Sequence, residues 1–219
     1  MSATPAQSQR RLASPRAKRR IVLAVVIVVV LILMGVGTKV VSNSSAALSS
    51  DGGFAPAAYG KKQFPKVQAE IAKRAVPAAT LAAEIAADPA GAGAKYGVKA
   101  TTGPVMSVSF TGVAGEPQDG IYPVAVEGLP QSLIVRVQTG PAINGTDLRD
   151  ATGTIKFGQF TNQIDYQNAG AALNDQMKKS VLAAVDTANL KGKTITVVGA
   201  FELINPNGWL VTPSELRAK

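Results

Sequence analysis

An uninterrupted apolar segment near the N-terminus constrains this chain more than any other feature. It runs from Ile21 to Val41, and it contains no charged residue from Ile21 to Gly37. At roughly 1.5 Å of rise per residue, a helix over this segment reaches about 31 Å, which matches a bilayer hydrocarbon core of roughly 30 Å. The segment therefore predicts a single transmembrane helix over residues 21–41.

The tail before this segment, residues 1–20, sets its expected orientation. The tail contains no acidic residue, and its basic residues are Arg10, Arg11, Arg16, Lys18, Arg19 and Arg20. Because Lys and Arg gather on the cytoplasmic side of membrane helices, we expect the N-terminus in the cytoplasm and the rest of the chain outside the cell membrane. A cleaved signal peptide is the alternative, although the apolar run is longer than usual for one and no clear A-x-A site follows it.

The charged and reactive residue types exclude several classes of function. The formal net charge is +9, but six of the 23 basic residues lie in the tail, which leaves 17 basic against 14 acidic residues. That excess is too small and scattered to predict a nucleic-acid-binding surface. The chain has no cysteine for disulfides or a lipobox, and no histidine to act as a general base or metal ligand. We therefore expect no cofactor and no metal.

Beyond the apolar segment, helical patterns come before strand patterns. Residues 42–60 are rich in Ser, Ala and Gly, which predicts a flexible stalk. Residues 61–92 have apolar residues at helical spacing interrupted by Pro77, which predicts two short helices broken near Ala75. The stretch "AGAGAKYG" that follows them is expected to be a loop.

Residues 93–219 show the alternation that is typical of strands. Strands are expected in "GPVMSVSFTGVAG", "GIYPVAVEG" and "SLIVRVQTG", with Thr152 to Phe160 as a fourth candidate. A helix follows in "IDYQNAGAALNDQMKKSVLAAVDTANLKG", with Gly192 as its candidate C-cap, and "KTITVVGAFELI" and "GWLVTP" then form two strands joined by the turn "NPNG". This order predicts an α+β chain with an OB-like five-stranded Greek-key barrel and one helix between strands. A general α+β sheet is the alternative.

The densest run of polar and turn-forming residues extends from Gly140 to Asn174. Asp147 and Asp150 offer a pair of carboxylates of the kind that glycoside hydrolysis requires. Arg149 stands between them in sequence and is expected to pair with one of them instead. Asn162 directly precedes the predicted helix, where it is placed to act as the N-cap.

The residues considered for binding are those that would form one exposed face of this segment, together with the sole tryptophan. Trp209 would either stack on a sugar ring or, as is more common, pack at the end of the barrel. The full set of candidate binding residues is Asp147, Arg149, Asp150, Asn162, Gln163 and Trp209.

The same polar segment, with "VVGAFEL" and "VTPSEL" further on, resembles a bacterial family of predicted periplasmic lipoproteins called domain of unknown function 2291. The resemblance extends from about Phe54 to Leu216. Members called lipoproteins need an acylated cysteine, which this chain lacks, so a transmembrane anchor would replace the lipid. The matching positions are Gly140, Pro141, Gly145, Thr146, Arg149, Asp150, Phe157, Phe160, Asn162, Gln163, Ile164, Tyr166, Ala172, Leu173 and Asn174.

The resemblance implies a role in sugar uptake, because genes of this family tend to lie beside carbohydrate ABC transporter genes, and it attaches no reaction to the family. We therefore expect a membrane-anchored extracytoplasmic binding or interaction module rather than an enzyme. Its expected partners are the membrane and either sugar ABC transporter components or a solute-binding protein. Two alternatives stay open: a structural cell-envelope protein without a ligand, and a glycan-acting hydrolase that uses Asp147 and Asp150.

Overall fold

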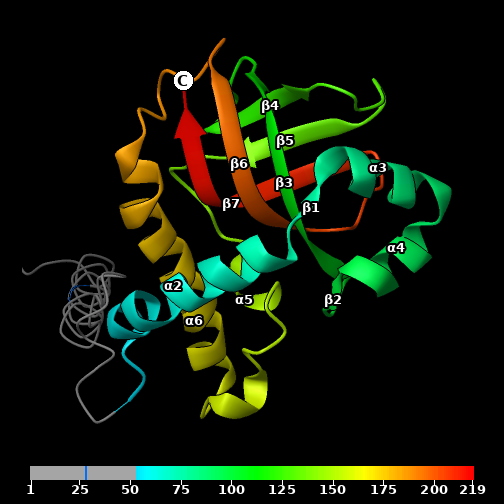
Figure 1. The fold of residues 1–219 in the computed structure, drawn as a ribbon. Coiled ribbons are helices and arrows are strands. Elements are labelled where there is room, and N and C mark those ends of the chain that lie inside the picture. The colour runs from blue at the N-terminus through cyan, green and yellow to red at the C-terminus, as the bar shows by residue number, and fades with distance from the viewer. Residues whose placement is uncertain (1–27, 29–52) are drawn as a thin grey trace, which may run out of the picture. The chain divides into compact units, whose positions relative to one another are not determined.

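The computed structural model describes Val28 and residues 53–219 (Figure 1). The basic tail, the transmembrane helix predicted over residues 21–41 and most of the predicted stalk therefore lie outside the described residues. Within the part of the chain that is described, no helix combines the length and the apolar composition needed to cross a bilayer.

Five strands close into a barrel. They are β3 (Pro104–Ala114), β4 (Ile121–Val126), β5 (Ile134–Gln138), β6 (Thr194–Glu202) and β7 (Gly208–Ala218). The strand order is β3-β4-β5-β7-β6, and the pairing of β6 with β3 closes the ring. All these pairs are antiparallel except β5 with β7, which is parallel. This is the Greek-key order of an OB barrel, so the predicted OB-like five-stranded barrel is confirmed.

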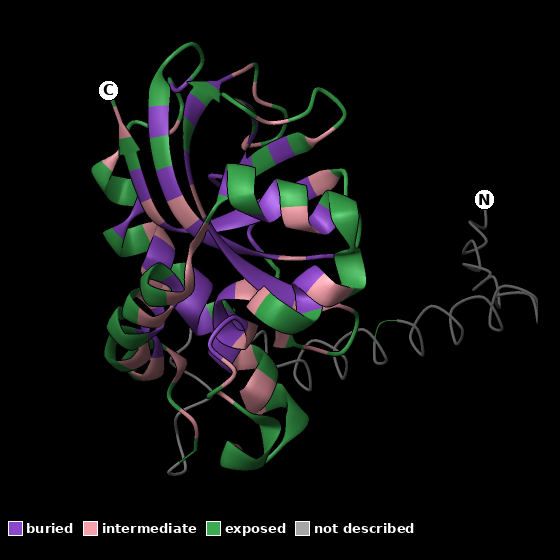
Figure 2. Cartoon of the chain, turned by 45° about the vertical axis from the view of Figure 1, so that its right-hand side comes forward, coloured by how far each residue is buried: buried purple, intermediate pink, exposed green. Residues whose placement is uncertain are grey.

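The core lies inside the barrel and beneath the helices that cover it. Buried and exposed residues alternate along the strands (Figure 2), as expected when one side of each strand faces the core. Cross-strand neighbours on the inner side, such as Met106 with Phe201 and Val137 with Val211, are all fully buried. The two-residue strands β1 (Val76–Pro77) and β2 (Val98–Lys99) both pair with β3.

Between residues 53 and 103, three helices precede the barrel: α2 (Pro56–Arg74), α3 (Ala78–Ala87) and α4 (Pro89–Tyr96). The predicted break near Ala75 is confirmed, because Ala75 is the C-cap of α2. Two boundaries differ from the prediction. The first helix begins at Pro56, inside the predicted stalk, because proline is well suited to the first turn of a helix. The predicted loop "AGAGAKYG" is mostly α4, whose small residues allow it to pack closely on β3.

The segment between β5 and β6 leaves the barrel and forms helices. It contains α5 (Asp147–Asp150), the 3₁₀ turn η1 (Phe157–Gln159), α6 (Gln163–Ser180) and the 3₁₀ turn η2 (Leu182–Ala184). The prediction of a strand from Thr152 to Phe160 is wrong, since this stretch pairs with no strand and turns at Gly153, whose φ is +67°. Gly192 does not cap α6, which ends earlier at Ser180.

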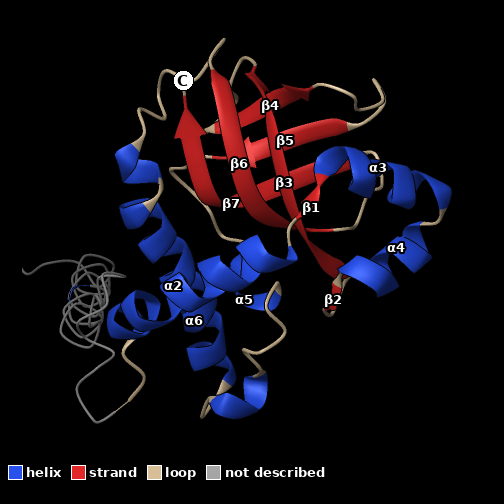
Figure 3. Ribbon diagram, viewed as in Figure 1, coloured by secondary structure: helices blue, strands red, loops and turns tan. Residues whose placement is uncertain are grey.

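The helices gather around one end of the barrel (Figure 3). Helices α2 and α6 pack on each other, and α5 lies between α6 and the barrel strands β6 and β7. Helices α3 and α4 pack together beside β1 and β3. The polar segment from Gly140 to Asn174 thus supplies both α5, which lies against the barrel, and the first part of α6.

Candidate functional site

Arg149 is the centre of a buried polar network on α5. Its guanidinium makes two bonds to the Asp150 carboxylate, with Nε 2.7 Å from Oδ1 and a terminal nitrogen 2.9 Å from Oδ2. The expected ion pair is therefore confirmed, and it is buried rather than on the surface, since Arg149 is 8% exposed. Because the guanidinium is buried and its charge is balanced by Asp150, Arg149 is poorly placed to bind a ligand.

Residues from the start of α6 complete this network. The Arg149 guanidinium lies over the Tyr166 ring, 3.7 Å from its centroid, and also donates a hydrogen bond to the Tyr166 carbonyl at 3.1 Å. Thr146 Oγ1 and the Tyr166 hydroxyl both donate to Asp150, at 2.7 and 3.4 Å. Burial raises the pKa of the Tyr166 phenol, and the negative charge of Asp150 acts in the same direction. The network joins α5 to α6 and is structural in character.

Asp147 occupies a separate polar site against the barrel. Its Oδ2 accepts a hydrogen bond from Thr212 Oγ1 on β7 at 2.8 Å, and Thr212 in turn accepts one from Gln138 Nε2 on β5 at 2.8 Å. Burial raises the pKa of the Asp147 carboxyl to about 6, despite the hydrogen bond from Thr212 that lowers it, and the nearby charges of Glu202 and Asp150 raise it further. Asp147 is therefore a weaker acid than an exposed aspartate and stays protonated up to a higher pH.

The two candidate catalytic carboxylates do not face a common cavity. Asp147 lines a small pocket of about 320 Å³ with Glu202 and Gln138, whereas Asp150 lines a different one with Lys156 and Phe157. Asp150 also forms an ion pair with Arg149. Because a glycoside must lie between its two carboxylates, this geometry gives no support to the hydrolase alternative. Among the residues that the structure describes, no cluster of acidic, histidine or cysteine side chains is suited to hold a metal ion.

Asn162 and Gln163 lie on the surface at the start of α6. Asn162 is the N-cap of this helix, as predicted, because its Oδ1 accepts a hydrogen bond from the Asp165 backbone N–H at 2.9 Å. Both residues are exposed, whereas Arg149 is buried and Asp147 points to the barrel. The candidate binding residues therefore do not form one exposed face.

Trp209 is fully buried, so its ring offers no surface on which a sugar can stack. It stacks on Phe201 instead, with ring centroids 4.7 Å apart and an interplanar angle of 17°. The indole N–H donates to the Pro206 carbonyl at 3.2 Å, which ties β7 to the turn before it. The sugar-stacking interpretation of Trp209 is corrected accordingly, and the packing alternative agrees with its position.

Asn174 and Ala172, the last part of the polar segment, hold α6 in place. Asn174 Nδ2 donates to the carbonyls of Ile143 and Gly145, at 3.1 and 2.8 Å, and so fixes the loop that leads into α5. Ala172 lies where α2 crosses α6 at Gly60, and a Cβ at Gly60 would stand only 2.4 Å from the Ala172 carbonyl oxygen. The matching residues at this end of the segment therefore serve helix packing.

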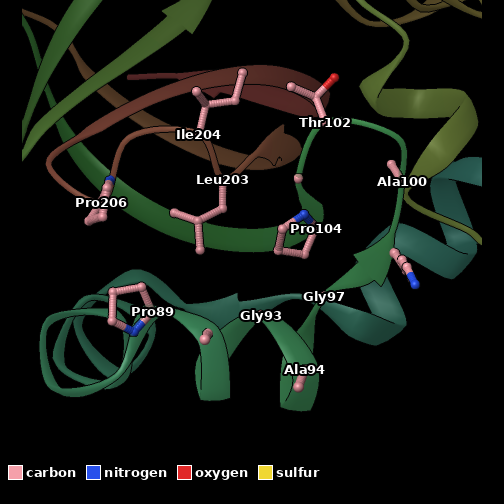
Figure 4. A pocket seen from close by; sticks show the side chains of 13 residues that line it. Pro89, Gly93, Ala94, Gly97, Ala100, Thr102, Pro104, Leu203, Ile204 and Pro206 are labelled. Atoms are coloured by element: carbon pink, nitrogen blue, oxygen red, sulfur yellow. The ribbon is translucent and has the colours of Figure 1, made fainter.

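An apolar pocket that the sequence reasoning missed lies between α4 and the β6–β7 turn (Figure 4). Its volume is about 520 Å³. Leu203 and Pro104 point into the space, and Gly93 and Ala94 form the side contributed by α4. At its rim Ile204, at the tip of the turn, is 69% exposed. Lys99 is the one charged side chain among the described residues that line this pocket.

A weak signal for this pocket exists in the sequence. Gly93 and Gly97 are four residues apart, so both lie on one side of α4. Added Cβ atoms would stand 2.7 Å from the Pro104 ring in both cases, so the glycines permit α4 to approach β3. Ile204 also lines the acidic pocket around Asp147, so the β6–β7 turn separates an apolar pocket from an acidic one.

Comparisons with known proteins agree with this architecture. A family model described as "Predicted periplasmic lipoprotein (DUF2291)" matches residues 26–217. No curated protein matches the chain. A crystal structure described as an OB-fold protein from Thermotoga maritima is 19% identical, with a TM-score of 0.61, and the match covers 76% of this chain and 99% of that one. At this identity, the likeness shows the fold alone.

Proposed function

We propose that this chain, which belongs to the DUF2291 family of predicted periplasmic lipoproteins, is an extracytoplasmic binding or interaction module. The observation that carries the proposal is the apolar pocket beside the β6–β7 turn, with Ile204 exposed at its rim. In OB barrels, the loop between the fourth and fifth strands is one of the elements that contact ligands, and the β6–β7 turn occupies that place here. An exposed aliphatic side chain next to an apolar pocket is typical of a surface that binds a ligand or a partner protein.

We further propose that residues 21–41 anchor the module and that its partner belongs to a carbohydrate ABC transport system. The length of the apolar segment and the absence of charge from Ile21 to Gly37 support the anchor. The pocket favours a protein side chain over a bare sugar, because its lining offers few polar groups to pair with hydroxyls. A transporter component or its solute-binding protein is therefore a better fit than the free sugar.

The test is a comparison of variants in pull-downs from native membranes. The full chain should enrich a transporter component or a solute-binding protein, and Ile204→Asp should lose that enrichment because a carboxylate would be desolvated on binding. Val113→Asp is the matched control, since Val113 is also an exposed aliphatic residue, at 46%, but lies at the opposite end of β3 from Pro104, which lines the pocket. Enrichment of no transport component, together with no thermal shift by any sugar tested, would refute the proposal.

A structural cell-envelope role is the second candidate, and one observation favours it. Most polar residues of the segment from Gly140 to Asn174 are used in contacts within the protein, as in the Arg149–Asp150 pair. A deletion strain separates the two functions. A growth defect limited to a single carbohydrate would exclude the purely structural role, whereas a general envelope defect on every carbon source would favour it.

A further inference from the structure

Aromatic side chains form a continuous cluster where α2 begins, next to η1 and the start of α6. Phe160 lies at its centre, with its ring centroid 5.6 Å from that of Phe54, 5.7 Å from that of Tyr59 and 5.4 Å from that of Tyr166. The Phe157 ring packs edge-on against Tyr166 at 5.8 Å. The cluster thus connects the first described residues of the chain to the start of α6.

The outer side of this cluster is apolar and exposed. Phe157 in η1 is 50% exposed, and Ile164 in the first turn of α6 is 63% exposed. We call Phe157, Phe160 and Ile164 the aromatic face. Neither Phe157 nor Ile164 contributes to the buried core. Their exposure is therefore not explained by folding.

The charge around the aromatic face is positive. Lys156 is exposed next to Phe157, and the first half of α2 exposes Lys61, Lys62 and Lys66. Of the nearby acids, Asp150 is neutralised by Arg149, whereas Asp165 accepts a hydrogen bond from the neutral Asn162 amide at 3.0 Å and keeps its charge. The exposed lysines therefore outnumber the unneutralised acid. Exposed apolar side chains beside lysines are suited to a bilayer surface with anionic headgroups.

The path of the chain places the same face next to the proposed anchor. Phe54 belongs to the aromatic cluster, and the proposed membrane span ends at Val41. The eleven residues from 42 to 52 can reach at most about 38 Å when fully extended, and about 18 Å on average as a flexible linker. The cluster is therefore close along the chain to the proposed membrane span, and the linker is short enough for it to reach the bilayer surface.

We propose that the aromatic face rests on the membrane surface, with Phe157 and Ile164 inserted among the headgroups and the lysines paired with anionic lipid. The proposal rests on the membrane anchor proposed above. It goes further, because it gives the domain a fixed orientation relative to the bilayer. The yellow, N-terminal end of α6 would lie against the membrane, and β4, at the far side of the molecule (Figure 1), would point away from it.

The absence of cysteine from the chain makes the test direct. Phe157→Cys and Ile164→Cys in the full chain are each labelled with an environment-sensitive fluorophore. The chain is then reconstituted into vesicles of neutral and anionic phospholipid that carry spin-labelled lipid as a quencher. Val113→Cys and Ile134→Cys are matched controls, because both residues are apolar and exposed, at 46% and 56%, but lie on strands β3 and β5.

The expected result is quenching several-fold stronger at positions 157 and 164 than at 113 and 134. Adding Lys156→Glu should weaken the quenching at position 164, and so should replacing the anionic lipid by neutral lipid. Equal quenching at all four positions would overturn the proposal. Protection of positions 157 and 164 in native membranes without quenching in vesicles would also overturn it, because the face would then bind a protein.

The failure of the anchor can be told apart from the failure of this orientation. Flotation of the full chain with the vesicles reports the anchor alone. A chain that floats but shows equal quenching retains the proposed anchor and loses the membrane-resting face. A chain that does not float loses both proposals.

Discussion

The Asp147 carboxyl shows how one residue links the site to the stability of the barrel. Its pKa is raised to about 6 in the folded chain, mainly by burial, from an ordinary value of 3.8. The folded state therefore binds a proton more tightly than the unfolded state. The contribution of Asp147 to the free energy of unfolding is therefore greatest below about pH 4. This contribution is lost as the pH rises through about 6.

Asp147→Asn should remove this pH-dependent cost. An asparagine keeps an oxygen that can accept the hydrogen bond from Thr212, but it carries no charge. The free energy of unfolding should rise by about 3 kcal/mol at pH 7.5 and change little at pH 4. Trp209 is the sole tryptophan and is fully buried, so its fluorescence during urea unfolding provides the measurement. Asp175→Asn, at an exposed position, is the control, and an equal effect from it would contradict the argument.

Arg149 behaves differently, because it is paired. Arg149→Met would leave the Asp150 carboxylate, whose side chain is 15% exposed, without its counter-charge. Breaking a buried pair in this way costs about 3 to 5 kcal/mol. The double variant Arg149→Met, Asp150→Asn should recover part of the loss, since no uncompensated charge remains. If the double variant were as unstable as the single one, the Tyr166 stacking rather than the ion pair would hold the network together.

Among the elements, the crossing of α2 over α6 depends on a glycine. Alanine is a better helix former than glycine by about 1 kcal/mol, which alone would make Gly60→Ala stabilising. The Cβ at this position would stand 2.4 Å from the Ala172 carbonyl oxygen, however, and backbone atoms on packed helices cannot move aside cheaply. We expect a net loss of about 1 to 3 kcal/mol in urea unfolding. Gly158→Ala, where a Cβ meets nothing within 4 Å, should be close to neutral.

The same elements explain what the sequence can and cannot predict. The five barrel strands were predictable because each has a side that faces the core. Apolar and polar residues therefore alternate along strands such as β4 and β5. Helix α4 was not, because the glycines that suggest a loop are there to let the helix approach Pro104. Thr152 to Phe160 resembles a strand locally but finds no edge to pair with. In the first case a tertiary contact overrides the local pattern, and in the second the local pattern lacks the strand partner that it needs.

The candidate site shows the same division. The local contacts could be predicted, since the Arg149–Asp150 pair and the Asn162 cap each join residues that are close in the sequence. The pocket at Ile204 was not, because α4 and the β6–β7 turn are about a hundred residues apart and meet only after the barrel closes. Sequence reasoning therefore located the polar framework, whereas the surface that remains open for a partner emerged only from the fold.

For the whole molecule, the decisive property is its topology in the membrane. Both proposals above require the tail before residue 21 to lie in the cytoplasm and the barrel to lie outside. Ser8→Cys and Ser132→Cys form a matched pair, the first in the tail and the second in the exposed loop between β4 and β5. In intact cells, a membrane-impermeant maleimide should label only Ser132→Cys. After permeabilisation, it should label both.

Each other outcome identifies a different arrangement of the chain. Labelling of Ser8→Cys in intact cells would reverse the orientation and place the barrel inside the cell. Loss of the tail from the purified protein, detected by intact mass, would show that the apolar segment is a cleaved signal peptide, and the aromatic face would then lose its tether. If the tail is retained and protected from the reagent, the linker of residues 42–52 keeps the start of the folded domain within about 38 Å of the bilayer. Partners of the pocket at Ile204 would then have to come to the outer surface of the membrane.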